Sequence, residues 1–174
     1  MARINVFKTR RFVLKPLLPR HASQKYLAWL QDSAASRYIS AAKKTRKIQD
    51  LKNYIRKFSR RKNCIFLRIL TKKTNHHIGN IKYEPIDLDR KTAVMGILIG
   101  EPAWRGKGVA REVLKTTAKH LQAAGKIRKI YLGVKKDNLP AIRAYQKVGF
   151  KGVDRWENRR RPLKGQKIMV WNLG

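Results

Sequence analysis

The stretch "RGKGVAREVL", from Arg105 to Leu114, decides how the rest of the chain is interpreted. Two glycines stand one residue apart among basic side chains, directly before a segment whose apolar residues have helical spacing. Glycine lets a backbone approach an oxygen closely, and the free N–H groups at a helix start attract an anion. The stretch therefore predicts a phosphate-binding turn that opens a helix, with Arg105 and Lys107 adding positive charge.

Two phosphate-binding motifs are excluded or fit poorly. A P-loop needs Gly-Lys followed by Ser or Thr, and no such sequence follows the turn. A dinucleotide-binding fingerprint would match Gly106 and Gly108, but Arg111 stands where its third glycine belongs. Two interpretations of the turn remain: another kind of coenzyme site, or a surface turn that is merely rich in glycine and lysine.

The segments around this turn predict a single domain of the α/β or α+β class over residues 1–174. We expect a mixed, mostly antiparallel sheet of about six to seven strands, flanked by about four helices. Alternating or continuous apolar runs predict strands, and apolar residues three or four apart predict helices. The strands are expected at residues 10–17, 64–70, 76–86, 92–100, 127–134 and 165–173, with a further strand within 150–156. The helices are expected at residues 21–32, 48–62, 110–125 and 139–150.

The charge of the chain is extreme. Lys and Arg number 43 against 10 Asp and Glu, which gives a net charge of +33. Such a charge predicts attraction to polyanions, so nucleic acid and the ribosome are candidate partners, although a merely solvated cationic surface gives the same composition. The run "ENRRRPLKGQK" is among the densest, and Arg159 to Arg161 are candidates for holding an anionic acceptor.

Other residues set limits on compartment and chemistry. Cys64 is the single cysteine, so the chain has no internal disulfide, and its apolar surroundings indicate a structural strand residue in a reducing compartment. No apolar run reaches the length of a membrane span, so we expect a cytoplasmic protein without a membrane partner. His76 and His77 are neighbours that point to opposite faces of a strand, so no metal site is predicted.

Two motifs resemble landmarks of the GNAT superfamily of acyl-CoA-dependent N-acetyltransferases. "RGKGVA" is similar to its Arg/Gln-x-x-Gly-x-Gly/Ala signature, with Arg105, Gly108 and Ala110 at the signature positions. "DNLPAIRAYQKVGF", residues 137–150, resembles its second landmark. The opening "RRFVLKPLLPRHASQKYLAWLQD" resembles the branch that contains ribosomal-protein N-terminal and amino-sugar acetyltransferases. The resemblance covers nearly the whole chain.

The resemblance implies a GNAT-type domain whose sheet is split at a bulge, here near Glu101–Pro102, and acetyl-CoA as co-substrate. It implies that Tyr145 is the general acid that protonates the leaving sulfur, the alternative being a packing aromatic. Asn138 is expected to contact the pantetheine arm, to cap its helix, or both. The residues implied in coenzyme binding are Ile97, Leu98, Ile99, Arg105, Gly106, Lys107, Gly108, Val109, Ala110, Asn138 and Ala141.

The general base departs from the pattern of the family. Val94 stands where many relatives carry Glu, and Glu84 and Glu101 are the substitutes that the sequence offers. Without a carboxylate base, a low-pKa amine is favoured over a lysine side chain, because it is more often neutral at pH 7.

The acceptor is therefore expected to be a nucleotide-linked amino-sugar or another small amine, with an anionic acceptor among the candidates. Two alternatives remain open: a protein N-terminus of the ribosomal-protein type, and a non-catalytic nucleic-acid-binding module on the same fold. A homodimer is a further candidate assembly.

Overall fold

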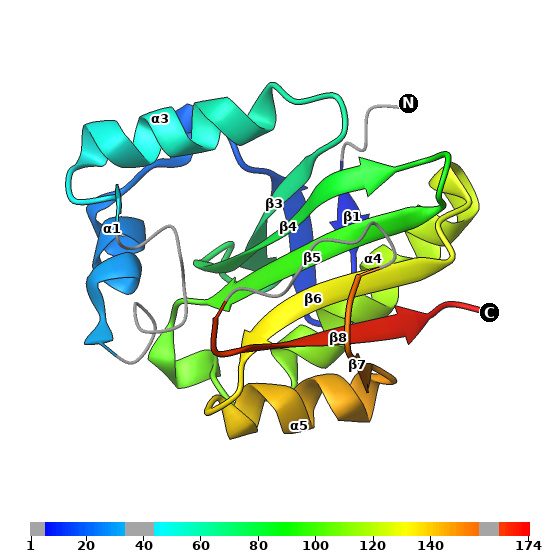
Figure 1. Cartoon of the computed structure of the whole chain (residues 1–174). Coiled ribbons are helices and arrows are strands. Elements are labelled where there is room, and N and C mark those ends of the chain that lie inside the picture. The colour runs from blue at the N-terminus through cyan, green and yellow to red at the C-terminus, as the bar shows by residue number, and fades with distance from the viewer. Residues whose placement is uncertain (1–5, 34–43, 157–163) are drawn as a thin grey trace.

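The computed structural model describes residues 6–33, 44–156 and 164–174 of the chain. A single eight-stranded sheet runs through it in the order β1-β2-β3-β4-β5-β6-β8-β7 (Figure 1). The strands are β1 (Phe7–Lys8), β2 (Phe12–Pro16), β3 (Ile65–Thr71), β4 (His77–Asp87), β5 (Thr92–Ile99), β6 (Lys129–Lys135), β7 (Lys151–Val153) and β8 (Gln166–Asn172). The α-helices are α1 (Gln24–Gln31), α3 (Ile48–Ser59), α4 (Val109–Gly125) and α5 (Leu139–Val148), and short 3-10 helices occur at η1 (Pro19–His21) and η3 (Pro102–Trp104).

The expected architecture is confirmed, with one more strand than the upper estimate. Every helix and strand expected from the apolar spacing is present, and the additional strand expected within residues 150–156 is β7. β1 was not predicted, because two residues are too short to show an alternation. Among the described strands, the only parallel pair is β5 with β6, which are joined through the crossover helix α4.

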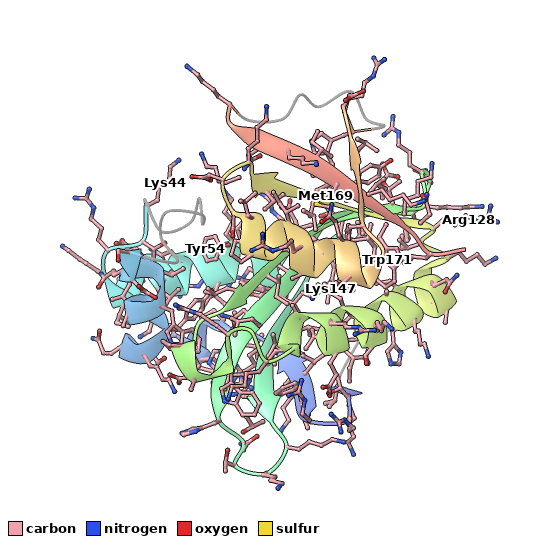
Figure 2. All side chains as sticks on the ribbon, turned by 90° about the horizontal axis from the view of Figure 1, so that it is seen from below. Lys44, Tyr54, Arg128, Lys147, Met169 and Trp171 are labelled. Atoms are coloured by element: carbon pink, nitrogen blue, oxygen red, sulfur yellow. The ribbon has the colours of Figure 1, made fainter. Side chains whose placement is uncertain are left out.

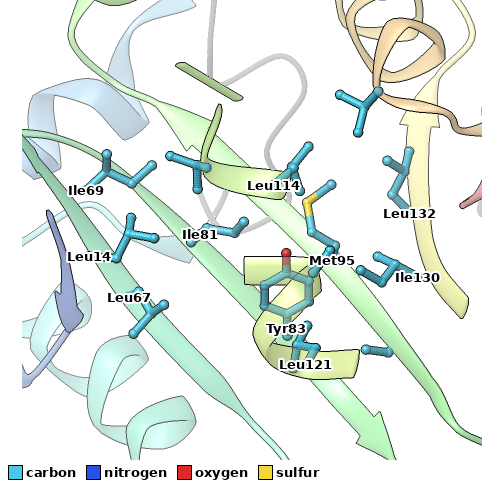
Figure 3. Close-up of a cluster of buried hydrophobic side chains, with 14 of the residues drawn as sticks. Leu14, Leu67, Ile69, Ile81, Tyr83, Met95, Leu114, Leu121, Ile130 and Leu132 are labelled. Atoms are coloured by element: carbon cyan, nitrogen blue, oxygen red, sulfur yellow. The ribbon is translucent and has the colours of Figure 1, made fainter. Parts of the chain in front are cut away.

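The sheet is covered on both faces, which explains why successive residues of β3, β4 and β6 are buried rather than alternate ones. On one face α4 and α5 enclose the larger core, where Tyr83 of β4 donates or accepts a 2.7 Å hydrogen bond with Thr117 of α4. Figure 3 shows this core between the strands and α4, with Ile81, Met95 and Leu114 around the Tyr83 ring.

On the other face α1 and α3 enclose a second core built from aromatic and aliphatic side chains. α1 begins at Ser23, whose hydroxyl accepts a hydrogen bond from the Tyr26 amide. Cys64 precedes β3 and packs half-buried against this second core, and burial raises the pKa of its thiol to about 11. The sequence predicted a structural cysteine within the strand; Cys64 lies one residue before β3 and is half-buried.

None of the helices in the described part of the chain combines the length and apolar composition that a membrane crossing requires.

Candidate active site at the split between two strands

The sheet opens between β5 and β6 shortly after the two strands meet. They pair only from Thr92 with Lys129 to Val94 with Tyr131, after which β5 stays with β4 and β6 stays with β8. Figure 1 shows the two strands diverging, green and yellow, across the middle of the sheet. The side of β5 that faces β6 thus has no strand partner beyond Val94.

The split lies beside a bulge, but not where the sequence placed one. The register between β4 and β5 shifts by one residue between Tyr83 and Ile86, opposite Val94. The expected bulge near Glu101–Pro102 is wrong, because the strand has already ended at Ile99 and Pro102 begins a 3-10 turn. A bulge needs a paired strand opposite it, and its position depends on the register of two strands far apart in sequence.

A cavity of about 270 Å³ lies at the split. Its walls come from α1, α3 and β3 on one side and from β6, β8 and α5 on the other. The lining residues are Tyr26, Leu30, Tyr54, Phe66, Asn80, Lys82, Met95, Gly96, Ile97, Leu98, Leu132, Gly133, Val134, Lys135, Asn138, Tyr145 and Gln166. The lining from the described residues contains two lysines and no carboxylate.

Tyr145 enters this cavity from α5. Its ring packs against Phe150 with the ring centroids 5.7 Å apart, and it joins the edge of the larger core. Burial raises the pKa of Tyr145 to about 12. The phenol is therefore protonated throughout the neutral range and is able to donate a proton or a hydrogen bond.

The predicted turn before α4 has the backbone that its glycines suggested. Gly106 and Gly108 have φ of 71° and 72°, in the left-handed region that favours glycine. Nothing lies within 4 Å of a Cβ built at Gly106, so the turn faces open space. Gly108 precedes Val109, the first helical residue, so the amide groups of the first turn of α4 are free of intrahelical partners.

A second hollow, of about 460 Å³, lies between this turn and α5. Five of the residues implied in coenzyme binding line it: Ile99 of β5 with Gly106, Gly108, Val109 and Ala110. Arg111 of α4 with Arg143 and Lys147 of α5 brings positive charge to the same hollow. Figure 2 shows Lys147 between α5 and α4. Neighbouring residues of β5 and of α5 line the first cavity and this hollow. The two spaces therefore lie next to each other along the same strand and helix.

Arg105 and Lys107 are placed differently from what their charge suggested. The Arg105 guanidinium donates to the Asp32 carboxylate at 2.8 Å and to the carbonyls of Ile99 and Gly100 at 3.1 and 2.9 Å. It therefore ties the end of β5 to the end of α1. Lys107 lines neither hollow, and its carbonyl accepts a 2.9 Å hydrogen bond from Arg11.

Asn138 caps its helix, as one of the two expectations has it, while its contact with a pantetheine arm stays a prediction. Its side chain caps α5 by accepting from the Ala141 amide at 3.4 Å, and it also lines the first cavity. Ala141 lines neither hollow and packs half-buried at the edge of the larger core. Ile97 and Leu98 line the first cavity from the open side of β5.

The two carboxylates proposed as substitute bases lie outside the cavity and are already paired. Glu84 accepts a 2.5 Å hydrogen bond from Arg61, and Glu101 forms an ion pair with Lys25. Among the described residues, no group of three or more His, Cys, Asp or Glu side chains lies close enough together to hold a metal ion. The run from Arg159 to Arg161 lies outside the described residues.

Sequence reasoning missed two parts of the site. Glu112 of α4 accepts hydrogen bonds from Thr9 at 2.6 Å and from the backbone and side chain of Arg11, both at 2.7 Å, so the start of the chain holds the turn before α4. The polar residues Asn80 and Lys82 of β4 lie at the α1 and α3 end of the cavity. The only available signal was that the two stand two residues apart and so point to the same face of a strand.

Comparison with known proteins defines the class of protein to which this site belongs. The model of the acetyltransferase (GNAT) domain matches residues 11–151, so the chain is a member of the GNAT acetyltransferase family.

Individual relatives match over shorter stretches. The chain is 36% identical over 70 residues to a spermine/spermidine N(1)-acetyltransferase of Bacillus subtilis, covering 40% of this chain and 43% of the relative. It is 39% identical over 75 residues to an N-alpha-acetyltransferase of Saccharolobus solfataricus, covering 43% of this chain and 44% of the relative. The chain thus spans under half the length of these curated relatives.

Among solved structures, a ribosomal-protein alpha-N-acetyltransferase in complex with coenzyme A has the same fold. Its TM-score is 0.80 at 12% identity, and the match covers 97% of this chain and 98% of that one.

Proposed function

We propose that the chain transfers an acetyl group from acetyl-CoA to an amine. The observation that carries this proposal is the split sheet, whose open β5 edge joins the cavity containing Tyr145 to the basic hollow at the start of α4. An open strand edge suits an extended amide-containing arm, and free helix-start amides beside three basic side chains suit a diphosphate. The hollow at the start of α4, of about 460 Å³, has a size typical of small-molecule sites, and the cavity at the split, of about 270 Å³, is slightly smaller.

Acetyl-CoA, when bound, supplies the acetyl group in activated form as a thioester. The residues of the chain orient it and the amine in one enclosed place, which removes much of the entropic barrier between two separate reactants. The β5 backbone from Ile97 to Ile99 is available to pair with the arm, and Gly106, Gly108, Val109 and Ala110 form the turn for the phosphates. Arg105 and Arg11 act indirectly: Arg11 holds the turn in place, and Arg105 holds the end of β5.

Tyr145 is the residue best suited to protonate the departing sulfur. It carries the proton at neutral pH because burial raises its pKa to about 12, and it stands in the wall of the cavity. No carboxylate from the described residues lines the cavity to take a proton from the amine. With the lining that the described residues provide, the amine arrives neutral or releases its proton to water.

This requirement favours an amine with a low pKa. Lys82 and Lys135 line the cavity, and their positive charge disfavours a protonated amine beside them. The same charges disfavour a polyamine, which carries several positive charges. An amino-sugar or another small amine, including a nucleotide-linked one, satisfies these conditions.

A protein N-terminus is the second candidate acceptor, because an α-amine also has a low pKa, near 8. The partial match to an N-alpha-acetyltransferase adds support to this candidate.

A panel of acceptors tests the proposal. Release of coenzyme A from acetyl-CoA would be followed with alaninamide, glucosamine, an N-acetyl-lysine amide and spermidine, each at the same concentration and near pH 7.5. We expect alaninamide or glucosamine to react about tenfold faster than the lysine and polyamine acceptors, because more of the amine is neutral. Preference for lysine or spermidine would contradict the acceptor class. No amine-dependent release at all would contradict the enzyme and favour the nucleic-acid-binding module.

A further inference from the structure

Asn80 carries a buried hydrogen-bond donor that has no partner among the described residues. The residue is 3% exposed and lines the cavity at the split. Its Oδ1 lies 2.8 Å from Nε2 of His77, whereas its Nδ2 is buried and has no hydrogen-bond partner in the part of the chain that the structure describes. Leaving an amide donor unsatisfied in the interior costs about 1–3 kcal/mol, so such a group in a native protein calls for an explanation.

The environment of His77 settles which way the Asn80 amide faces. Nε2 of His77 lies 3.0 Å from the carbonyl oxygen of Gly79 as well as 2.8 Å from Oδ1 of Asn80. A carbonyl oxygen can only accept, so Nε2 carries the hydrogen, and it donates to the oxygen of the Asn80 side chain. The Asn80 nitrogen is therefore turned away from His77.

His77 is well placed to hold this orientation. Its ring packs edge-on against Trp29 and Tyr26, with centroids 5.0 and 6.0 Å apart. Burial lowers the pKa of His77, and the positive charges of Arg68 and Lys25 lower it further. The hydrogen bonds to Asn80 and Gly79 raise this pKa but do not outweigh the burial. The ring is thus neutral at pH 7, with its hydrogen on Nε2.

Further donors lie beside Asn80 on the same face of the sheet. Lys82, two residues along β4, lines the cavity, and its Nζ donates to the Tyr54 hydroxyl at 3.3 Å. Nζ also lies 3.4 Å from the centre of the Phe58 ring. Arg68, directly opposite Asn80 on β3, has a buried Nε that likewise finds no partner among the residues that the structure describes. This end of the cavity therefore offers donors and no carboxylate acceptor from the described residues.

Gly96 leaves room next to these donors. It lies opposite Lys82 on β5, and nothing is found within 4 Å of a Cβ built at its position. The missing side chain leaves space in the cavity between Lys82 and the open part of β5. This space adjoins Lys82, two residues from Asn80 on the same face of β4.

We propose that Asn80 is the specificity-determining residue of the acceptor site, and that His77 is its positioning residue. Nδ2 of Asn80 donates to a carbonyl or carboxylate oxygen carried beside the reacting amine, with Lys82 as a second donor. The acceptor class is then an α-amino carbonyl compound, such as an amino acid amide or the first residue of a peptide. This inference rests on the proposed acetyl transfer and, among its candidate acceptors, favours a protein N-terminus or another α-amino carbonyl compound over an amino-sugar.

A substrate pair tests the inference. Alaninamide carries the carbonyl beside its amine, and isopropylamine has the same amine and methyl group without it. Their kcat/KM values would be measured for the wild type, Asn80→Asp, His77→Phe and the control Asn172→Asp. Asn80→Asp keeps the oxygen that faces His77 and removes the donor. Asn172 is exposed on β8 and undergoes the same chemical change away from the cavity.

We expect the preference for alaninamide over isopropylamine to fall roughly 10- to 100-fold in Asn80→Asp and His77→Phe. Asn172→Asp should keep the preference of the wild type. The ratio of the two kcat/KM values is compared between variants, so the difference in pKa between the two amines cancels. A variant that is merely less stable loses activity on both acceptors alike, which leaves this ratio unchanged. An unchanged ratio in Asn80→Asp would overturn the inference while leaving the acetyl transfer intact.

A binding measurement keeps the inference testable without turnover. Titration of 15N-labelled protein with N-acetyl-alaninamide, the expected product, should shift the side-chain NH2 resonance of Asn80 and leave that of Asn172 in place. Equal response of both resonances, or none, would contradict the subsite. A shift at Asn80 in a protein that acetylates no amine would support the subsite and contradict only the catalytic proposal.

Discussion

Tyr145 combines two properties that follow from its place in the cavity wall. Its ring packs against Phe150 at the edge of the larger core, and burial raises the pKa of its hydroxyl to about 12. The ring contact gives the side chain a fixed position, and the raised pKa keeps its proton available. A proton donor needs both.

Tyr145→Phe separates these properties, because phenylalanine keeps the ring and loses the hydroxyl. We expect kcat to fall about 100-fold or more, which is the range typical of a lost general acid. The affinity for acetyl-CoA and the melting temperature should stay near their wild-type values, since the ring packing remains. Steady-state kinetics together with a thermal melt checks this, and an unchanged kcat would return Tyr145 to the role of a packing aromatic.

At this scale, the sequence indicated residues that belong to a motif and missed those that act through geometry. Tyr145, Asn138 and the glycine turn were found because their spacing resembles a known family. Asn80 and His77 were not found, because the sequence does not show which polar atoms of a strand residue lack a hydrogen-bond partner. That requires the coordinates of the neighbouring strands and of α1.

The start of α4 shows how a helix end is positioned by a distant segment. The first turn of α4 includes Glu112, which accepts from Thr9 and Arg11, and Arg11 in turn donates to the carbonyl of Lys107. Burial tends to raise the pKa of Glu112, but the hydrogen bonds from Thr9 and Arg11 outweigh it and lower the pKa. The turn that faces the second hollow is therefore held by an ionised carboxylate.

The sign of this shift predicts a pH dependence. A lowered folded-state pKa means that the Glu112 contacts contribute stability above the unfolded value of 4.5 and that the contribution is lost as pH falls through the folded value. At pH 7 we expect Glu112→Gln to lower the melting temperature by about 2–4 °C, for a loss of about 1 kcal/mol. The difference between wild type and variant should shrink below about pH 4.

Thermal melts of both proteins from pH 3 to pH 7 measure this difference. Asp89→Asn, a carboxylate change in the exposed turn after β4, serves as the control. A difference that stays constant over the whole range would contradict the role given to the ionised Glu112.

Most elements were predictable because their apolar spacing is set by burial. α4 buries Val113, Leu114, Thr117, Ala118 and Leu121 on one face, which is the periodicity that predicted it. The position of the split was not predictable, since it depends on a one-residue register shift opposite Val94 rather than on any residue type. For the same reason the bulge was placed too far along the chain.

Because the whole molecule is so positively charged, binding at a specific site has to be distinguished from general electrostatic attraction of anions to its surface. With 43 basic residues against 10 acidic ones, most basic side chains cannot have a carboxylate partner. Figure 2 shows nitrogen-tipped side chains projecting around the outline of the molecule. Such a surface attracts any polyanion, and this attraction weakens strongly with added salt. Binding in an enclosed hollow depends on contacts that salt screens much less.

The most direct test of the account is a calorimetric titration with acetyl-CoA at about 0.1 M and about 0.5 M salt. The wild type would be compared with Ala110→Trp, which fills the hollow at the start of α4, and with Ala123→Trp, an exposed position on the same helix outside that hollow. We predict one-to-one binding that persists at the higher salt, is weakened about tenfold or more by Ala110→Trp, and is unchanged by Ala123→Trp. Binding that disappears at the higher salt, or that is the same in both variants, would contradict a coenzyme site in the split sheet.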